Sequence, residues 1–532
     1  MDLRSEEPQM YHPQLQTLDR TAAFHAAERP DRTAVVCEGR EVGYGELHRR
    51  SNRTARALHA AGAVRGSRVA YLGKESEHYY DILFGCAKAG TVLVPINWRL
   101  TASEVDHILR DSGTSLLFVE DEFLDVAHKA AAELPSQVRI VALDGPAGTG
   151  SGFTAWQAGH SDADPEESAS PDDPIAQIYT SGTTGLPKGV VLAHRSFFKV
   201  RDALASEGLG WIDWREDDVS LIGIPGFHIG GLWWATQGFN AGVTNVAMRM
   251  FVSGEAVRLI REHGVSTTCL VPAMLQMMLA EPGAGTADFA TLRKIVYGGS
   301  PISESLLQEC LERIGCEFAQ IYGLTETGNT AVCLPPHEHV AGGARLKAAG
   351  RPYPGFEAKI VDRAGRALPT GAIGEVCLRT PSRMLSYWGL PEATADTLVD
   401  GWIHTGDAGY LDDGGYVFIC DRIKDTIIVA GENVYPAEIE NALARHEAVV
   451  EAAVVGVPDE RWGEAIHAFV VVRPGHEVSP RQLVLALKGT VADFKIPSGF
   501  EFIETLPRNP SGKILRRELR DRFWQDRERQ VN

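Results

Sequence analysis

Residues 179–190 read YTSGTTGLPKGV, which places hydroxyl side chains, glycines and one lysine in a single short stretch. Glycine lets a backbone approach anionic oxygens closely, and the N–H groups around it can donate hydrogen bonds to phosphate. The kinase and GTPase loop, G-x-x-x-x-G-K-[ST], has a Mg²⁺-binding hydroxyl after its lysine, whereas here Gly189 follows Lys188. The stretch therefore predicts a phosphate-binding loop that serves another reaction. A Gly/Thr turn with a solvated lysine is the alternative.

Short apolar runs must form the elements that position this loop. They are rich in β-branched residues and recur along the chain as TAVVCEG, RVAYLG, TVLVPIN, SLLFVED, VRIVALDG, IAQIYTSG, VSLIGIP, TTCLVPA and KIVYGGS. Amphipathic stretches separate most of them: one begins with a capping box of Thr101 and Glu104, and another ends before Gly315. Strands alternating with helices predict parallel α/β sheets. After about residue 350 the pattern changes to short strands with turns, and a second unit is expected near 422.

Composition restricts the class of protein. The chain has 532 residues, more than one ordinary domain, and a net charge of −18, which disfavours nucleic-acid binding. Its eight cysteines show no C-x-x-C or zinc spacing, so neither a structural metal nor a disulfide framework is expected. The start, MDLRSEEPQMYHPQ, is no signal peptide, and no apolar run predicts stable membrane insertion. We expect a cytoplasmic enzyme; a homodimer is left open.

Five further stretches follow the loop in a fixed order: QIYGLTE (320–326), GWIHTGD (401–407), DRIKD (421–425), AGENVYPAEIE (430–440) and PRNPSGKI (507–514). Together they resemble the adenylate-forming superfamily, which includes acyl-CoA synthetases, peptide-synthetase adenylation domains and beetle luciferase. The resemblance covers roughly residues 20–520. It implies that a carboxylate attacks the α-phosphate of ATP to give acyl-AMP and pyrophosphate. A thiol, usually that of coenzyme A (CoA), then displaces AMP.

The resemblance also implies an architecture. The fold class is α/β, with a large N-terminal AMP-binding domain (1–421) of two doubly wound α/β subdomains and a small β-barrel-like one. A mobile C-terminal α+β domain (422–532) follows a hinge near 422–425. Lys424 lies in this hinge, and Gly431 would border the tunnel for the incoming thiol, where a side chain would block it.

Individual roles follow from the same resemblance. The β- and γ-phosphates are assigned to Thr180, Ser181, Gly182, Thr183, Thr184 and Lys188, and Mg²⁺ to Glu326 and Thr184. Adenosine and the α-phosphate are assigned to Gly299, Ser300, Gln320, Tyr322, Thr325, Asp407 and Arg422. Tyr322 would stack on adenine, and Asp407 would accept the ribose hydroxyls. The catalytic residues would be Lys513, Glu326 and His228, with Lys513 bridging the carboxylate and the α-phosphate. The alternative is that these residues have structural roles only: Thr325 would cap a helix, Asp407 would lie in a turn, and Lys513 would be a surface lysine.

The acyl pocket is expected around Phe227, His228, Trp233 and Gly298. His228 would orient the acid or gate the site, although a lone histidine in an apolar run is as often a core residue. No Asp or Glu stands between Phe227 and Phe239, so an amino-acid ammonium would have no partner. We therefore expect an apolar small-molecule acid, either a medium- or long-chain fatty acid or a bulky polycyclic one.

Several functions share these motifs. An acyl-CoA synthetase using ATP, Mg²⁺ and CoA is favoured, because acyl-AMP ligases that avoid CoA typically carry an insertion that is not evident between 326 and 422. The second reading is an acyl-AMP ligase that loads a separate carrier protein, since no carrier domain follows Lys513. The third is an adenylate-binding sensor without turnover. A luciferase-like oxygenase would rest on fold alone.

Overall fold

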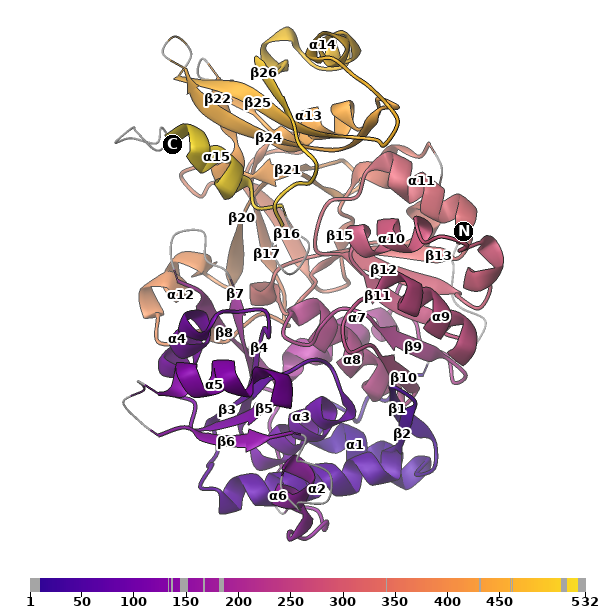
Figure 1. Ribbon diagram of the computed structural model, residues 1–532, viewed down its shortest axis with the longest axis vertical. Coiled ribbons are helices and arrows are strands. Elements are labelled where there is room, and N and C mark those ends of the chain that lie inside the picture. The colour runs from indigo at the N-terminus through magenta and orange to yellow at the C-terminus, as the bar shows by residue number, and fades with distance from the viewer. Residues whose placement is uncertain are drawn as a thin grey trace.

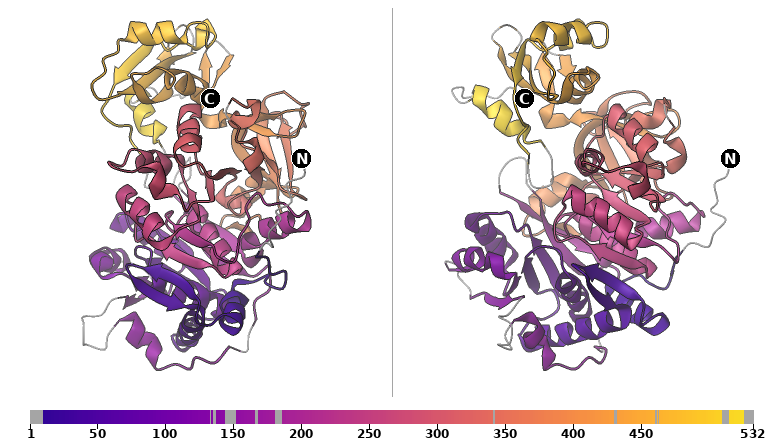
Figure 2. Two further views of the ribbon diagram at one scale, coloured as in Figure 1. Left: turned by 90° about the vertical axis from the view of Figure 1, so that its right-hand side faces the viewer. Right: turned by 45° about the vertical axis from the view of Figure 1, so that its right-hand side comes forward.

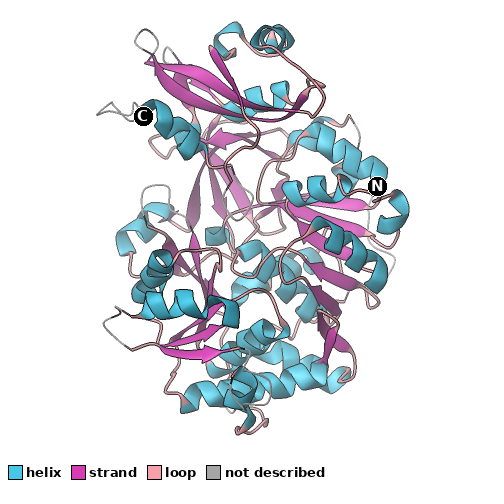
Figure 3. Cartoon of the chain, in the orientation of Figure 1, coloured by secondary structure: helices cyan, strands magenta, loops and turns pink. Residues whose placement is uncertain are grey.

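The computed structural model describes residues 10–132, 134, 137–143, 152–165, 168–180, 186–340, 342–429, 432–459, 461, 463–508 and 514–524. Figure 1 shows the two larger sheets in the lower and middle part of the molecule and the C-terminal sheet at the top. Two further views show the same order of parts along the long axis (Figure 2). Strands and helices alternate through the lower part (Figure 3), as the sequence predicts.

A seven-stranded sheet carries the phosphate stretch. Its order is β18-β8-β7-β4-β3-β5-β6, and the pairs among β7, β4, β3, β5 and β6 are parallel. The strands are β3(Arg68–Leu72), β4(Val92–Ile96), β5(Leu116–Val119), β6(Arg139–Ala142), β7(Pro174–Thr180), β8(Lys188–Ala193) and β18(Ser386–Tyr387). The predicted phosphate strand is thus β7, and the lysine of the loop opens β8.

A nine-stranded sheet lies beside it, in the order β15-β14-β13-β12-β11-β9-β10-β1-β2. The strands from β13 to β1 in this order are parallel, and both edges end in antiparallel pairs. The strands are β1(Thr33–Cys37), β2(Arg40–Gly43), β9(Val219–Ile222), β10(Thr244–Ala247), β11(Thr267–Leu270), β12(Lys294–Gly298), β13(Glu317–Tyr322), β14(Val332–Leu334) and β15(Arg351–Pro352).

Helices cover both faces of both sheets. One apolar core lies between the sheets and includes α1(Leu18–Glu28), α2(Tyr44–Ala60), α3(Glu77–Ala89), α7(Lys199–Ser206) and α8(Ile229–Ala241). The outer face of the nine-stranded sheet is covered by α9(Ser253–His263), α10(Pro272–Leu279) and α11(Glu304–Arg313). The outer face of the seven-stranded sheet is covered by α4(Ala102–Ser112) and α5(Leu124–Ala131), and α6(Phe153–Ala158) contacts α2. The prediction of two doubly wound α/β subdomains is confirmed.

Two smaller sheets complete the fold. The third is antiparallel, with order β16-β17-β20-β19 and β21 on β20: β16(Glu357–Val361), β17(Gly374–Arg379), β19(Leu398–Val399), β20(Trp402–Leu411) and β21(Val417–Arg422). The helix α12(Pro391–Thr397) contacts β20. The fourth contains β22(Ile427–Val429), β23(Glu432–Val434), β24(Val449–Asp459), β25(Gly463–Val472) and β26(Gly499–Phe502). Its faces carry α13(Pro436–Leu443) and α14(Pro480–Leu487) on one side and α15(Arg516–Trp524) on the other.

Local sequence signals set the helix ends. The predicted capping box is present, because Glu104 Oε2 accepts the backbone N–H of Thr101 at 2.8 Å. The same helix ends at Gly113, whose φ is +65°, a left-handed conformation that favours glycine. Its apolar residues Val105, Ile108 and Leu109 are all buried. The helix therefore packs on the sheet with the face that its sequence predicts.

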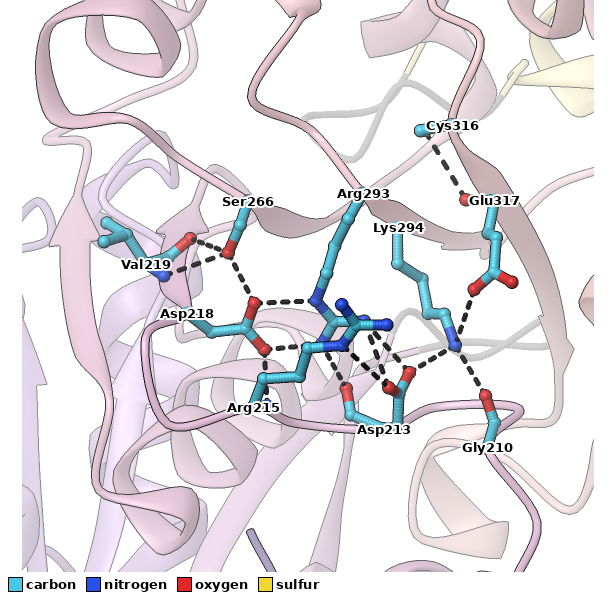
Figure 4. Close-up of polar contacts among 10 residues, drawn as sticks. All are labelled: Gly210, Asp213, Arg215, Asp218, Val219, Ser266, Arg293, Lys294, Cys316 and Glu317. Atoms are coloured by element: carbon cyan, nitrogen blue, oxygen red, sulfur yellow. Dashed lines mark hydrogen bonds and ion pairs between the residues drawn. The ribbon is translucent and has the colours of Figure 1, made fainter. Parts of the chain in front are cut away.

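A buried ion-pair network ties together the amino ends of the parallel strands in the nine-stranded sheet (Figure 4). Asp218 precedes β9, and its carboxylate accepts hydrogen bonds from Arg293 Nε at 2.7 Å and Ser266 Oγ at 2.6 Å. Lys294, the first residue of β12, pairs with Asp213 and lies 3.1 Å from Glu317 of β13. Burial would raise the pKa of Asp213, but the charges of Lys294 and Arg293 outweigh it and lower that pKa.

The chain passes from the third sheet to the fourth between Arg422 and Ile427. The division into residues 1–421 and 422–532, with a hinge at 422–425, remains a prediction about how the two parts move. Within the described residues, no helix is long and apolar enough to cross a membrane.

Candidate active site

A cleft of about 1370 Å³ lies where three sheets and the start of the fourth meet. The nine-stranded sheet contributes the carboxyl ends of β9, β11, β12 and β13, which are neighbours in the sheet and run parallel. The facing walls come from β7 and β8, from β16, β17 and β20, and from the first residues of the fourth sheet. The carboxyl edge of a parallel sheet is where ligands bind in open α/β folds.

The cleft gathers many of the predicted residues from distant parts of the chain. Those that line it are Thr180, Lys188, His228, Gly298, Gly299, Thr325, Glu326, Arg422 and Lys424. Those that do not line it are Phe227, Trp233, Ser300, Gln320, Tyr322 and Asp407. The predictions for Ser181, Gly182, Thr183, Thr184, Gly431 and Lys513 concern positions outside the described residues.

The two ends of the phosphate stretch are held close together. Thr180 closes β7 and Lys188 opens β8, and these two residues are direct partners in the antiparallel pair. Just before Lys188, the carbonyl of Pro187 accepts a hydrogen bond from His107 Nε2 of α4 at 3.2 Å. The strands and α4 therefore fix both ends of the stretch at the cleft.

Glu326 lies on the same side of the cleft. Its Oε1 accepts a hydrogen bond from the hydroxyl of Tyr387 at 2.6 Å, and the ammonium of Lys188 lies 4.9 Å from the centre of the Tyr387 ring. Burial and the Glu326 charge raise the pKa of Tyr387, so its hydroxyl stays a donor. A cleft-facing carboxylate held in this way beside a phosphate stretch fits a hard cation such as Mg²⁺, which takes oxygen ligands.

Tyr387 was not among the predicted site residues. It belongs to the two-residue strand β18, which joins the seven-stranded sheet by pairing with Val190 and Val191 of β8. That pairing brings it to the cleft from a position 61 residues after Glu326 in sequence. The stretch SYWG carries no local pattern that indicates chemistry, so only the strand pairing could have revealed it.

Asp407 lies at another part of the site and is only 4% exposed. It accepts a hydrogen bond from the Tyr322 hydroxyl at 2.7 Å, and Arg422 Nε lies 2.7 Å from its other oxygen. Asp407 and Arg422 are cross-strand partners on β20 and β21. Burial and the Asp407 charge raise the pKa of Tyr322 well above its usual value. The carboxylate predicted to bind ribose and the tyrosine predicted to stack on adenine are thus in direct contact, and Thr405, Gly406 and Arg422 face the cleft beside them.

Gly298 and Gly299 end β12 at the cleft. A Cβ on Gly298 would lie 2.3 Å from the carbonyl oxygen of Ile321 in the neighbouring strand, so sheet packing requires a glycine there. Gly299 has φ of +82°, a left-handed conformation. Gln320, which was also predicted to contact the nucleotide, does not line the cleft. Its side-chain oxygen accepts a hydrogen bond from the buried Tyr297 hydroxyl at 3.0 Å.

The remaining wall of the cleft is largely apolar. From the nine-stranded sheet and the helices that follow its strands come Ile224, Ile229, Cys269, Val271, Met274 and Leu324. His228 stands among them at the start of α8, and its Nε2 is buried with no hydrogen-bond partner among the described residues. Burial, with a smaller effect of Arg99, lowers the pKa of His228 to about 4. The imidazole is therefore neutral at physiological pH.

The aromatic residues predicted for this pocket lie behind it. Trp233 is 1% exposed and belongs to the core between the two sheets, and Phe227 packs its ring 4.6 Å from that of His228. A residue that the sequence reasoning missed faces the cleft instead. Asn329 has φ of +85°, and its Nδ2 is buried with no partner among the described residues. Strained backbones of this kind persist where a site needs them.

Residues in and around the first strands of the fourth sheet reach the same cleft. Lys424, Asn433 and Tyr435 contribute to its lining, although they follow the third sheet in the chain. Burial lowers the pKa of Lys424, partly offset by the neighbouring Asp425. In this arrangement the segment flanking the predicted thiol tunnel faces the same space as the phosphate stretch.

Comparison with known proteins gives this arrangement a family. A family model described as AMP-binding enzyme matches residues 23–388, and its C-terminal domain model matches residues 438–513. The chain is 68% identical to a Streptomyces coeruleorubidus protein named fatty acid–[acyl-carrier-protein] ligase ScoC, over 98% of this chain and 99% of that one. It is 38% identical to indoleacetate–CoA ligase of Aromatoleum aromaticum, over 93% and 96%. The solved structure of ATP-bound MatB from Rhodopseudomonas palustris matches with a TM-score of 0.87 at 30% identity, covering 96% of this chain and 99% of that one.

Proposed function

This chain belongs to the AMP-binding enzyme family of adenylate-forming ligases, and from that premise we propose that it activates a fatty acid with ATP and transfers the acyl group to an acyl carrier protein. The observation that carries the proposal is the shared cleft. It joins a phosphate-binding side, with Thr180, Lys188 and Glu326, to an apolar wall suited to an acyl chain.

In the first half-reaction, a carboxylate oxygen of the acid attacks the α-phosphorus of ATP. The bond from that phosphorus to the bridging oxygen breaks, and pyrophosphate leaves. Lys188 and Thr180 hold the departing phosphates, with Ser181, Gly182, Thr183 and Thr184 between them. Glu326 and Thr184 would hold Mg²⁺, which lowers the negative charge of the triphosphate when bound. Lys513 stabilises charge at the α-phosphate.

We assign binding of the acid to the apolar wall of the cleft, beside His228. A neutral His228 at the start of α8 can donate a hydrogen bond to a carboxylate without adding a second buried charge. The residues that form the apolar wall with His228 include no Asp or Glu, so an ammonium group bound there would lack a partner. These features support an apolar acid and disfavour an amino acid.

In the second half-reaction, a thiol attacks the acyl carbonyl carbon. The bond to the AMP oxygen breaks, AMP leaves, and the thiol proton passes to solvent. We assign the change between the two steps to a rotation of residues 422–532 about Lys424, after which Lys513 withdraws and Gly431 borders the thiol tunnel. The position of Asn433 and Tyr435 in the cleft supports the assignment of this segment to the second step.

The carrier protein is favoured as acceptor by the 68% identical relative. That alignment covers 98% of this chain and 99% of the relative, so the relative has about the same length and no added segment. It is nevertheless named as a ligase that acts on an acyl carrier protein. The missing insertion, which favours CoA on sequence alone, therefore loses its weight.

CoA is the second candidate acceptor. Indoleacetate–CoA ligase, which is 38% identical and nearly as long, supports it. A free CoA and a carrier protein present the same phosphopantetheine thiol, so the tunnel alone does not distinguish them. The difference lies outside the tunnel, in contacts either to the CoA nucleotide or to the surface of a protein.

The test uses purified protein, ATP and Mg²⁺ with a panel of fatty, aromatic and polycyclic acids. Acid-dependent pyrophosphate release and acyl-AMP are measured with no acceptor, with CoA and with a holo acyl carrier protein. We expect one class of apolar acid to support turnover, with the acyl group on the carrier by intact mass. Turnover with CoA alone would move the assignment to an acyl-CoA synthetase. Lys513→Ala should bind ATP but make no acyl-AMP; equal function of that variant would support a sensor.

A further inference from the structure

Three metal-binding side chains meet beside the cleft and have no part in the proposed reaction. Glu375 and Cys377 lie two positions apart on β17, so they face the same side of the strand. His404 lies on β20 as the direct cross-strand partner of Cys377. A carboxylate oxygen, the thiol sulfur and an imidazole nitrogen all lie within 4.8 Å of one another.

One distance among these atoms matches that around a small tetrahedral ion, and another is shorter. His404 Nδ1 lies 2.8 Å from Glu375 Oε2 and 3.6 Å from Cys377 Sγ. With Zn–S near 2.3 Å and Zn–N near 2.0 Å, a tetrahedral site separates sulfur and nitrogen by about 3.6 Å. The sulfur and nitrogen therefore already have the spacing of zinc ligands, whereas the hydrogen bond between His404 and Glu375 must open from 2.8 Å to about 3.3 Å.

The burial of these three side chains suits a metal site that opens to the cleft. Cys377 is fully buried, while Glu375 and His404 are partly exposed and line the cleft, which gives an ion a way in. The neighbouring Lys359 is the cross-strand partner of Cys377 on β16, but its ammonium lies 4.4 Å from the Trp402 ring. Burial raises the pKa of the Cys377 thiol, and the Lys359 charge partly offsets that rise.

The trio is linked to the nucleotide side of the cleft. Glu375 Oε1 accepts the backbone N–H of Gly406 at 3.0 Å, and Gly406 precedes Asp407. Thr405, next to His404, accepts the backbone N–H of Asp407 at 3.1 Å. An ion that binds between Glu375 and His404 replaces their hydrogen bond and moves the two groups apart, and it therefore acts on the turn that presents Asp407.

We propose that Glu375, Cys377 and His404 bind one Zn²⁺ ion, or another thiophilic divalent cation, and that this binding inhibits acyl-AMP formation. Cys377 binds as the thiolate and releases its proton to solvent. Three protein ligands leave a fourth position for water from the cleft. Thiolate and imidazole ligands select zinc-like ions over Mg²⁺, which keeps oxygen ligands, so the site is separate from Glu326. The inhibition rests on the proposed function; the binding does not.

Binding is tested first with metal-free, reduced protein and Co²⁺, whose absorption reports thiolate ligation and tetrahedral geometry. We expect a thiolate-to-cobalt band with one ion per chain, lost when Zn²⁺ is added. Cys377→Ser should remove the band and weaken binding by at least about tenfold. Cys420→Ser, at a partly exposed cysteine on the adjacent strand β21, should keep it. A band that survives Cys377→Ser, or that is absent from the wild type, overturns the site.

Inhibition is tested by acid-dependent pyrophosphate release at saturating Mg²⁺ with increasing Zn²⁺. Without Zn²⁺, Cys377→Ser should match the wild type, because Cys377 does not line the cleft. The Zn²⁺ concentration for half-inhibition should rise at least about tenfold in this variant. Equal sensitivity would place inhibition elsewhere, for example at Glu326, and contradict the proposal. Cys377→Ala replaces the serine variant if thermal melting shows that the latter misfolds. Activity absent even without metal would count against the proposed function, while the cobalt result would still decide the site.

Discussion

At the scale of single residues, Tyr387 joins the lysine of the phosphate stretch to the carboxylate of Glu326. Its hydroxyl fixes one oxygen of Glu326 at 2.6 Å, and Lys188 stands 4.9 Å from its ring. Tyr387→Phe removes that hydrogen bond, together with a contact to Thr397, and keeps the ring. Because a hydrogen bond to a charged group contributes about 1.5–3 kcal/mol, we expect kcat/KM for acyl-AMP formation to fall roughly 10- to 100-fold.

The chain offers a matched control for this variant. Tyr416 donates a hydrogen bond to Glu338 at 2.7 Å, outside the cleft. Tyr416→Phe should lose a similar contact without changing acyl-AMP formation. Pyrophosphate release at varied Mg·ATP compares the two variants, and equal kinetic effects would show that the Tyr387 contact is only structural.

His228 gives a prediction about pH. Burial favours the uncharged imidazole and lowers its pKa to about 4, so protonation begins only as the pH falls toward that value. Between pH 5.5 and 8, wild type and His228→Gln should therefore show pH profiles of the same shape, whatever their absolute rates. An acid limb centred near pH 6.5 in the wild type, absent from the variant, would contradict a neutral His228.

The sequence predicts some of these residues and misses others for a physical reason. Glu326, Lys188 and Arg422 lie in motifs to which the resemblance to the adenylate-forming superfamily assigns nucleotide or Mg²⁺ binding, and the fold brings them to one cleft. Tyr387 and Asn329 depend on contacts that no local pattern encodes: a two-residue strand paired across the chain, and a left-handed backbone. A local motif also does not show which aromatic side chains belong to the core. The sequence therefore predicts Trp233 in the acyl pocket, whereas its side chain is 1% exposed and packs behind that pocket.

At the scale of elements, the ion-pair network of Figure 4 holds the strand ends opposite the cleft. Lys294→Met would leave the buried Asp213 without one of its two main cationic partners. Removing one partner of a buried ion pair costs about 3–5 kcal/mol, so the urea midpoint should fall clearly. Activity of the folded variant should change little, because the network is at the far edge of the sheet.

A surface ion pair serves as the control for Lys294. Lys347 lies 3.0 Å from Glu304 with its side chain 60% exposed, and such pairs contribute at most about 1 kcal/mol. Lys347→Met should therefore leave the urea midpoint nearly unchanged. Since the pKa of Asp213 is lowered in the folded protein, its contribution is present at neutral pH and is lost only as pH falls through that lowered value. A Lys294→Met midpoint equal to that of the wild type would contradict a stabilising network.

Element types were predictable where hydrophobic pattern and end signals agree. All nine apolar runs of the N-terminal part coincide with strands, because buried parallel strands need continuous apolar sequence. Sheet order was not predictable. The hairpin of β1 and β2 joins the nine-stranded sheet through β10, and β18 joins the other sheet through β8. Such pairings depend on contacts across most of the chain, which local pattern does not specify.

At the scale of the whole molecule, the proposal requires residues 422–532 to rotate between two half-reactions about Lys424. Lys424→Pro restricts the backbone there, whereas Lys424→Ala removes the ammonium and leaves the backbone free. We expect the proline variant to change the ratio of the two half-reaction rates by at least about tenfold. Single-turnover acyl-AMP formation and transfer from preformed acyl-AMP measure the two rates. Equal losses in both, or the same ratio in the alanine variant, would speak against a backbone hinge.

The central claim is that this ligase passes a fatty acyl group to a carrier protein, and a direct competition tests it. One vessel contains the enzyme, ATP, Mg²⁺, the preferred acid, and equal concentrations of CoA and a holo acyl carrier protein. Mass spectrometry then measures acyl-carrier and acyl-CoA over time. We predict that the acyl group accumulates on the carrier while CoA stays free. Accumulation of acyl-CoA with an unmodified carrier would contradict the claim.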